Sequence, residues 1–245
     1  MNIAMWSGPR NLSTAMMYAF GARPDCAVWD EPFYAAYLKA TGKAHPMAAE
    51  IMARHETDPA RVARRCAAPA PDGSPLFYQK QMAHHVLPEF DLGWMAHATH
   101  VFLIRHPARV IASYAAKREE VAPGDIGAAE QHALYAKAEA AMGRPPPVID
   151  SADIRAAPEA MLRALCAAIG IAFERRMLSW PAGGRVEDGA WAPHWYGAAH
   201  RSTGFAGPEG PLPEVPRDLR PVLDRAMEPY ESLRARALAP ETDHA

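Results

Sequence analysis

The sequence lacks the features of a membrane-spanning, secreted or disulfide-linked protein. None of its apolar runs approaches the roughly 20 residues that a transmembrane helix needs. No basic segment precedes an apolar one at the N-terminus, so no secretory signal is visible. The three cysteines, Cys26, Cys66 and Cys166, form no CxxC pair. We therefore expect reduced thiols in a cytoplasmic protein.

Metal-binding patterns and a broad basic surface are also missing. The 11 histidines include no H-E-x-x-H pattern, so we expect no metal site. The net charge is -2 at pH 7, and basic and aromatic residues do not alternate as they do in nucleic-acid-binding proteins. We expect neither a nucleic-acid nor a membrane partner, and any basic site has to be local.

What is present is an ordinary globular composition with alternating strand and helix patterns. Hydrophobic residues make up 49% of the 245 residues and charged residues 22%, which suits one substantial core. Short apolar runs predict strands at residues 3–6, 26–29, 76–79, 101–104 and 147–150. Helical periodicity predicts helices at residues 12–20, 48–66, 108–118, 128–141, 158–169 and 217–238.

This alternation predicts a single α/β domain over residues 1–240. Its central sheet should be mostly parallel and flanked by helices on both faces, which makes a three-layer sandwich. Residues 180–216 are rich in glycine, proline and aromatic residues and have little periodicity, so we expect a long loop or lid there. In such folds the ligand lies outside the carboxyl ends of the strands.

The first predicted strand leads into a segment typical of an anion-binding loop. The order of residues 2–20, NIAMWSGPRNLSTAMMYAF, predicts a strand, a tight turn and the start of a helix. Free backbone N–H groups and the helix dipole favour an anion there. Arg10, Ser13 and Thr14 add a cation and two hydroxyls. No Gly-Lys pair follows Gly8, so this is not the usual nucleotide-hydrolase loop.

A second basic strand end lies in the segment VFLIRHPARVIASYAAKRE. Arg105 follows the predicted strand, and Ser113 comes eight residues later. Nucleotide hydrolases often have an aspartate here that helps to hold Mg²⁺, whereas a guanidinium binds phosphate through a bidentate fork. Arg105 therefore indicates a second phosphate bound without a metal. Asp150 also ends a predicted strand, so a metal-holding acid there stays open.

Together, the two segments resemble the sulfotransferase family that uses 3′-phosphoadenylyl sulfate. The later stretch VIDSADIRAAPEAMLRALCAAIGIAF is also similar to that family, so the resemblance covers roughly residues 1–180. Residues 9–14, PRNLST, are similar to the family's P-K-S-G-T-T loop, and Arg105-His106-Pro107 with Ser113 matches its Arg-x-Pro motif with a serine eight residues after the arginine. The resemblance implies that the first loop binds the 5′-phosphosulfate of the donor through Arg10, Asn11, Ser13 and Thr14. It implies that Arg105 and Ser113 bind the 3′-phosphate.

The sequence departs from the family pattern in three places. Leu12 stands where the family has glycine, and Arg10 stands where it has lysine. The C-terminal G-x-x-G-x-x-K motif of the cytosolic animal enzymes is absent. We expect the basic and aromatic stretch of residues 195–205, and Arg201 within it, to take over the closing of the nucleotide site.

Candidate acid–base groups follow two other strands. Lys80, His84 and His85 lie in YQKQMAHHVLP, and the family has a similar strand-end lysine with a nearby histidine. There, the resemblance implies that the lysine stabilises the bridging oxygen and the histidine takes the acceptor's proton. Another branch of the family uses a glutamate as base, and Glu31, just after the second predicted strand, would suit that role; a helix-capping role for it stays open. The choice among these groups stays open at this point.

The resemblance implies transfer of a sulfuryl group from 3′-phosphoadenylyl sulfate to a hydroxyl or amine of a small molecule. No metal is expected in that reaction. The resemblance also implies a three-layer sandwich like that of P-loop nucleotide hydrolases. A kinase or hydrolase on the same fold and a degenerate, non-catalytic nucleotide-binding protein are the alternatives. The aromatic residues of the 180–216 segment hint at an apolar or ring-bearing acceptor, although they could equally serve packing alone: Trp191, Trp195, Tyr196 and Phe205. The sequence leaves the oligomeric state open.

Overall fold

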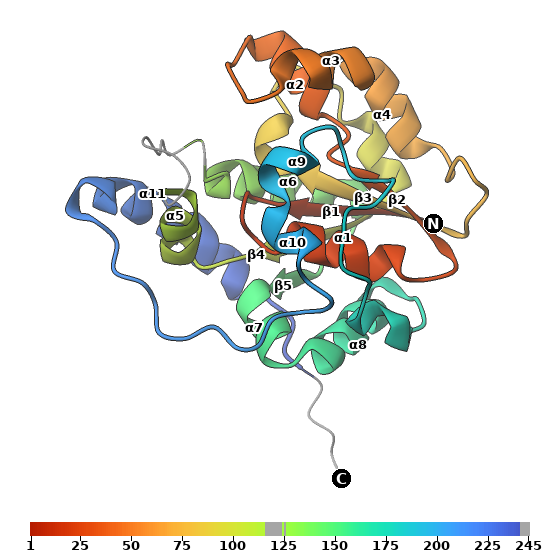
Figure 1. The fold of residues 1–245 in the computed structure, drawn as a ribbon. Coiled ribbons are helices and arrows are strands. Elements are labelled where there is room, and N and C mark those ends of the chain that lie inside the picture. Colours follow the sequence, from red (N-terminus) through yellow and green to blue (C-terminus); the bar gives the residue numbers. More distant parts are fainter. Residues whose placement is uncertain (116–123, 125, 241–245) are drawn as a thin grey trace.

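A computed structural model describes residues 1–115, 124 and 126–240 of the chain. Five parallel strands form one sheet in the order β2-β3-β1-β4-β5, which confirms the predicted single α/β domain (Figure 1). The strands are β1 (Asn2–Ser7), β2 (Cys26–Asp30), β3 (Leu76–Met82), β4 (Thr99–Ile104) and β5 (Val148–Asp150).

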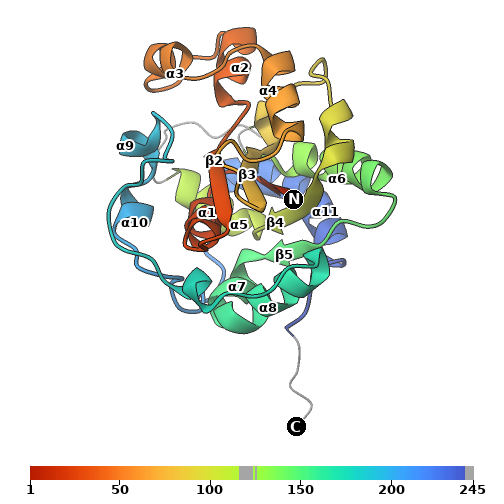
Figure 2. The same ribbon diagram turned by 90° about the vertical axis from the view of Figure 1, so that its right-hand side faces the viewer.

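Helices cover both faces of the sheet, so the central strands are apolar on both sides. Successive side chains of a strand point to opposite faces. Ile3 and Met5 belong to a core shared with α1 (Ser13–Gly21) and α8 (Pro158–Ile169). Ala4 and Trp6 belong to another shared with α6 (Ala128–Met142) and α11 (Arg220–Arg234). Figure 2 shows α1 on one side of the sheet and α6 and α11 on the other.

One predicted helix is wrong, because residues 48–66 form two helices. These are α3 (Ala48–Arg54) and α4 (Pro59–Ala67). The side chain of Asp58 caps α4 by accepting a hydrogen bond from the backbone N–H of Ala60 at 2.9 Å, with Pro59 in the first turn. This cap and proline are the usual start of a helix and interrupt the longer pattern. Helix α2 (Tyr34–Thr41) was not predicted from the sequence.

The remaining elements include two more helices and several short 3₁₀ turns. Helix α5 (Pro107–Ala115) begins as expected, while the end predicted at residue 118 lies outside the described residues. Helix α7 (Ser151–Ala156) connects β5 to α8. The 3₁₀ turns are η1 (Ala83–His85), η2 (Gly93–His97), η4 (Arg175–Leu178) and η5 (Arg217–Leu219). Within the described ranges, no helix is both long and apolar enough to cross a membrane.

The 180–216 segment is mostly irregular and contains the short helices α9 (Ala192–Trp195) and α10 (Gly197–His200). Polar contacts fix it to α1 and to the end of β2. Asp188 accepts hydrogen bonds from the Tyr18 hydroxyl at 2.9 Å and from His200 Nε2 at 3.0 Å. Asp30, at the end of β2, accepts one from the backbone N–H of Gly189 at 3.0 Å. After α10 the chain continues as a long connection to α11 (Figure 1).

Candidate active site

All five strands end at the same edge of the sheet, and a cavity of about 360 Å³ opens there. Parallel strands bring their carboxyl ends together, so loops far apart in sequence meet at this edge. The lining includes nine of the residues singled out from the sequence: Arg10, Ser13, Thr14, Glu31, Lys80, His84, His85, Arg105 and Ser113. The structure thus brings nine of the eleven expected donor-binding and acid–base residues to one cavity; Asn11 and Arg201 are not in its lining.

The β1–α1 loop has a strained backbone. Arg10 and Leu12 both have positive φ angles, 62° and 72°, in the left-handed region that favours glycine. Such a conformation costs a non-glycine residue about 1–2 kcal/mol. Leu12, at the position where the related family has glycine, thus keeps the glycine-like conformation at the start of α1. Gly8 is needed for another reason: a Cβ there would lie 2.7 Å from the carbonyl oxygen of Ile126.

Two polar side chains of this loop reach toward β4 and α5. The Nε atom of Arg10 donates a hydrogen bond to Ser113 Oγ at 2.9 Å, which joins the two predicted phosphate motifs directly. Asn11 is buried and donates from Nδ2 to the carbonyl oxygen of Leu103 at 3.2 Å. Asn11 thus fixes the loop to β4, and its side chain is absent from the lining of the cavity.

Four arginines gather at one end of the cavity, and we call them the arginine cluster: Arg10, Arg105, Arg109 and Arg155. Nη1 of Arg105 donates to the backbone carbonyl of Arg10 at 2.7 Å. Burial, and then repulsion by Arg105, lowers the pKa of Arg10. Because like charges repel, a cluster of this kind is stabilised by an anion.

Part of that anion is supplied by the protein itself. The side chain of Glu209 is only 3% exposed and forms ion pairs with three of the arginines. Its Oε2 lies 2.9 Å from Arg109 Nε, its Oε1 lies 2.9 Å from Arg155 Nη1, and Arg105 Nη2 donates to the same Oε1. Arg201, the predicted nucleotide-closing residue, is exposed and absent from the cavity lining.

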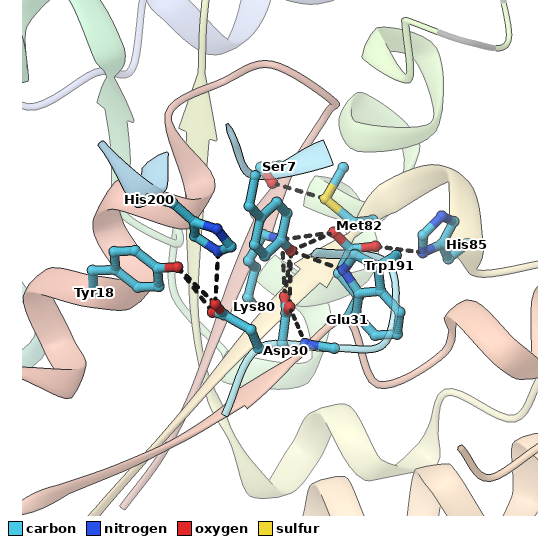
Figure 3. Close-up of polar contacts among 12 residues, drawn as sticks. Ser7, Tyr18, Asp30, Glu31, Lys80, Met82, His85, Trp191 and His200 are labelled. Carbon is cyan, nitrogen blue, oxygen red and sulfur yellow. Dashed lines mark hydrogen bonds and ion pairs between the residues drawn. The ribbon is translucent and has the colours of Figure 1, made fainter. Parts of the chain in front are cut away.

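At the other end of the cavity lies a buried group of ionisable side chains, the carboxylate cluster: Asp30, Glu31, Lys80 and Tyr196. Lys80 Nζ is 2.9 Å from Asp30 Oδ1 and 2.6 Å from Glu31 Oε1 (Figure 3). The Tyr196 hydroxyl lies 2.8 Å from Asp30 Oδ2 and 3.2 Å from Glu31 Oε1, and it also contacts Lys80 Nζ. Glu31 has a φ of 40°, so the backbone is strained here as well.

For Glu31 and for Lys80, burial and the opposite charge of the neighbouring group act on the pKa in opposite directions. Burial raises the pKa of Glu31, although Lys80 works against this shift. Burial also opposes the charge of Lys80, but attraction to Asp30 and Glu31 outweighs it and raises the pKa of the ammonium group. Lys80 is therefore a fixed cation, while Glu31 is a carboxylate whose proton affinity is increased, as general bases require.

The two adjacent histidines occupy different environments. His85 is buried and stacks on Tyr34, with ring centroids 4.3 Å apart, and on Tyr37 at 5.0 Å. Burial, with repulsion by neighbouring cations, lowers the pKa of His85 well below its usual value. Its Nδ1 is 3.7 Å from Glu31 Oε2, too long for a hydrogen bond (Figure 3). His84 is half-buried and lines the cavity.

Arg109, Arg155 and Glu209 were not assigned to the site from the sequence, and Tyr196 was not assigned to the acid–base group. Arg155 follows the end of β5, so the strand-end rule that pointed to Arg105 could have found it. Tyr196 and Glu209 both arrive from the irregular 180–216 segment. No local pattern in that segment indicates which side chains turn back to the sheet.

Asp150, which ends β5, has a structural role. Its Oδ1 accepts a hydrogen bond from the backbone N–H of Ala152 at 2.8 Å and caps α7, and its Oδ2 accepts one from the Tyr230 hydroxyl at 2.9 Å. Within the part of the chain that the structure describes, no group of three or more histidine, cysteine or acidic side chains could hold a metal ion.

The chain belongs to the sulfotransferase domain family, whose model matches residues 1–237. Its fold is similar to the sulfotransferase domain from the curacin biosynthetic pathway, with a TM-score of 0.55 and 14% sequence identity, covering 97% of this chain and 98% of that one. This low identity supports the fold alone. The resemblance inferred from the two phosphate motifs is thereby confirmed at the level of family and fold.

Two plant proteins are more similar in sequence. The branched-chain-amino-acid aminotransferase-like proteins 2 and 1 of Arabidopsis thaliana are 35% and 36% identical to this chain over 235 and 237 residues. Those alignments cover 95% of this chain but 41% of each plant protein. The chain thus spans about two fifths of the length of these relatives.

Proposed function

We propose that the protein transfers a sulfuryl group from 3′-phosphoadenylyl sulfate to a small acceptor. One observation carries this proposal: a single cavity joins an arginine cluster to a carboxylate cluster that contains a candidate base. Sulfuryl transfer needs both, because the donor is a polyanion and the acceptor has to lose a proton. Membership of the sulfotransferase domain family supports the same reaction class.

The arginine end of the cavity fits the donor. Arg105 and Ser113 are the proposed ligands of its 3′-phosphate, with Arg155 added from the structure. The Nε atom of Arg105 is buried and makes no hydrogen bond to any residue that the structure describes, so it keeps a donor for an anion. Arg10 with Ser13 and Thr14 at the start of α1 would hold the 5′-phosphosulfate.

Glu31 is the proposed general base. Its raised pKa strengthens it as a base, whereas the lowered pKa of His85 makes that imidazole a weaker one. His85 stacks between tyrosines, which suits a structural role beside Glu31. His84, which also lines the cavity, is the second candidate. Lys80 is held by two carboxylates and would position Glu31.

The proposed reaction forms one bond to sulfur and breaks another. The acceptor's hydroxyl or amine loses its proton to the Glu31 carboxylate, and its oxygen or nitrogen bonds to the sulfur. The bond between the sulfur and the 5′-phosphate oxygen breaks, and that oxygen takes the electron pair. The nearby Arg10 would neutralise the negative charge that develops there, as cations do in phosphoryl transfer.

We propose an apolar or ring-bearing small molecule as the acceptor. The cavity lining includes aromatic or apolar side chains: Leu12, Tyr34, Met82, Trp195 and Tyr196. Small-molecule sites are typically apolar with a few polar groups that fix the orientation of the ligand. Glu31 is the polar group that an acceptor hydroxyl or amine would meet.

The test is transfer of labelled sulfate from 3′-phosphoadenylyl sulfate across a panel of phenols, aliphatic alcohols and amines. We expect label to appear in an organic product with release of 3′,5′-adenosine bisphosphate. The Glu31→Gln protein should bind the bisphosphate but give no product. Binding without transfer to any acceptor would favour a non-catalytic binding protein, and Mg²⁺-dependent turnover of ATP would favour a kinase or hydrolase.

A further inference from the structure

Glu209 has an unusual position for a residue of an exposed connection. Gly207, Pro208 and Gly210 around it are exposed, whereas its own side chain is 3% exposed. We call residues 204–211 the strap. Three guanidinium groups meet the one carboxylate of the strap, so the cluster holds more positive charge than Glu209 neutralises.

The same arginines also hold the backbone of the strap. Arg155 Nε donates to the carbonyl oxygen of Gly207 at 2.8 Å, and Arg109 Nη2 donates to that of Gly210. Gly204, Ala206 and Glu209 line the cavity, so the strap forms part of its wall. Gly204 pairs with Ser179 and Phe205 packs on Trp180, so the start of the strap is held independently. The polar contacts described for the rest of the strap are those with Arg105, Arg109 and Arg155.

A carboxylate and a phosphate make the same kind of bidentate contact with a guanidinium. A phosphate monoester carries a charge of about -1.5 to -2 at pH 7, against one negative charge for a glutamate. The arginine cluster should therefore prefer a phosphate over Glu209 when both compete. Because Arg105 is the proposed ligand of the donor's 3′-phosphate, both anions need the same guanidinium.

We propose that Glu209 is an internal ligand of the arginine cluster that a phosphate has to displace in order to bind. Displacement releases Gly207 and Gly210 from the arginines, so the strap moves when the phosphate enters. The identity of the phosphate as that of a nucleotide rests on the proposed function, whereas the competition itself needs only an anion of sufficient charge.

The test compares Glu209→Gln with Glu214→Gln, an exposed glutamate beyond the strap, as the matched control. Calorimetric titration with 3′,5′-adenosine bisphosphate and with inorganic phosphate gives the affinities. Removing an internal competitor should tighten both by about tenfold or more, since the ion pairs of Glu209 with the arginines are charge-assisted. The control should bind as the unsubstituted protein does. Equal or weaker binding by Glu209→Gln would overturn the proposal.

Hydrogen exchange of the unsubstituted protein gives a second, independent readout. Saturating bisphosphate, or inorganic phosphate if the nucleotide does not bind, should speed amide exchange within residues 204–211. Slower or unchanged exchange on binding would contradict displacement. If Glu209→Gln binds inorganic phosphate more tightly while no variant binds the bisphosphate, the internal ligand stands and the proposed donor falls. If all variants bind the bisphosphate equally, the proposed donor stands and Glu209 is not an internal ligand.

Discussion

The charged side chains at the two ends of the cavity differ in how deeply they are buried. The arginine cluster is partly exposed, with side chains 16% to 22% accessible for Arg105, Arg109 and Arg155, and its one carboxylate comes from an irregular segment. The carboxylate cluster is buried, with Lys80 and Asp30 side chains 1% exposed, and its cation comes from strand β3, which has a strand on each side. The first arrangement suits exchange of anions, and the second suits a fixed geometry.

This difference follows from the elements that supply the groups. Asp30 and Lys80 are register partners on the neighbouring strands β2 and β3, so their separation is set by the sheet. Glu209 lies on a strap with exposed glycines and has no strand partner. Groups held by strands keep their positions when a ligand binds, whereas groups on loops can leave.

The largest expected effect is on the chemical step. Glu31→Gln removes the proposed base but keeps the size of the side chain and its contact with Lys80. Loss of a general base typically lowers turnover by about 10²–10⁴-fold. We expect this loss in kcat for sulfate transfer, with bisphosphate affinity unchanged. Glu89→Gln, at an exposed glutamate, is the matched control, and turnover by Glu31→Gln equal to that of the control would assign the base elsewhere.

A second substitution, in the carboxylate cluster, should lower the stability of the fold. Lys80→Met leaves Asp30 and Glu31 buried without their cation, and removal of one partner of a buried ion pair typically costs about 3–5 kcal/mol. Urea unfolding should show this loss in the free energy of unfolding. Lys39→Met, at an exposed lysine, should change it by less than about 0.5 kcal/mol. A similar small value for Lys80→Met would mean that the cluster contributes little to stability.

Substitutions in the arginine cluster should affect nucleotide binding rather than folding. Arg155→Ala removes one guanidinium that lines the cavity, and we expect about tenfold weaker bisphosphate binding, since a hydrogen bond to a charged group contributes about 1.5–3 kcal/mol. Arg201→Ala tests the residue singled out from the sequence, and its exposed side chain should matter less. Calorimetry measures both, and the reverse order would restore Arg201 as the donor ligand.

The smallest effect should be a shift in the pH dependence of turnover. Burial raises the pKa of Glu31, and the hydrogen bond from Tyr196 partly lowers it again. The ionised form accepts the proton, so kcat rises with pH through the pKa of Glu31. Tyr196→Phe removes the hydrogen bond, and the midpoint of this rise should move to higher pH. Tyr230→Phe, which loses a hydroxyl bonded to Asp150 instead, should leave the midpoint unchanged. An unchanged midpoint in Tyr196→Phe would contradict the link to Glu31.

The fold was largely predictable because buried parallel strands appear as short apolar runs. Residues 3–6 and 101–104 lie within β1 and β4 as observed. Helix α2 was missed because five of its eight residues are buried, from Tyr34 to Leu38, which leaves no polar face to give a helical period. The pair α3 and α4 was merged because an amphipathic pattern hides a break that only Asp58 and Pro59 signal.

The candidate site was predictable where strand ends supply it. Arg10, Glu31 and Arg105 follow strands, and Lys80 lies near the carboxyl end of β3, so parallel topology alone brings them together. Tyr196 and Glu209 depend instead on long-range packing of an irregular segment. The contacts of that segment, such as Asp188 with Tyr18, have no local sequence pattern that would reveal them.

The most direct test of the account is calorimetric binding of 3′,5′-adenosine bisphosphate in comparison with 5′-AMP. The 3′-phosphate is the group that Arg105, Ser113 and Arg155 are proposed to bind. We predict at least about tenfold tighter binding of the bisphosphate, the effect of a charge-assisted contact. Equal affinity for the two nucleotides, or no binding of either, would contradict a donor site for 3′-phosphoadenylyl sulfate at the arginine cluster.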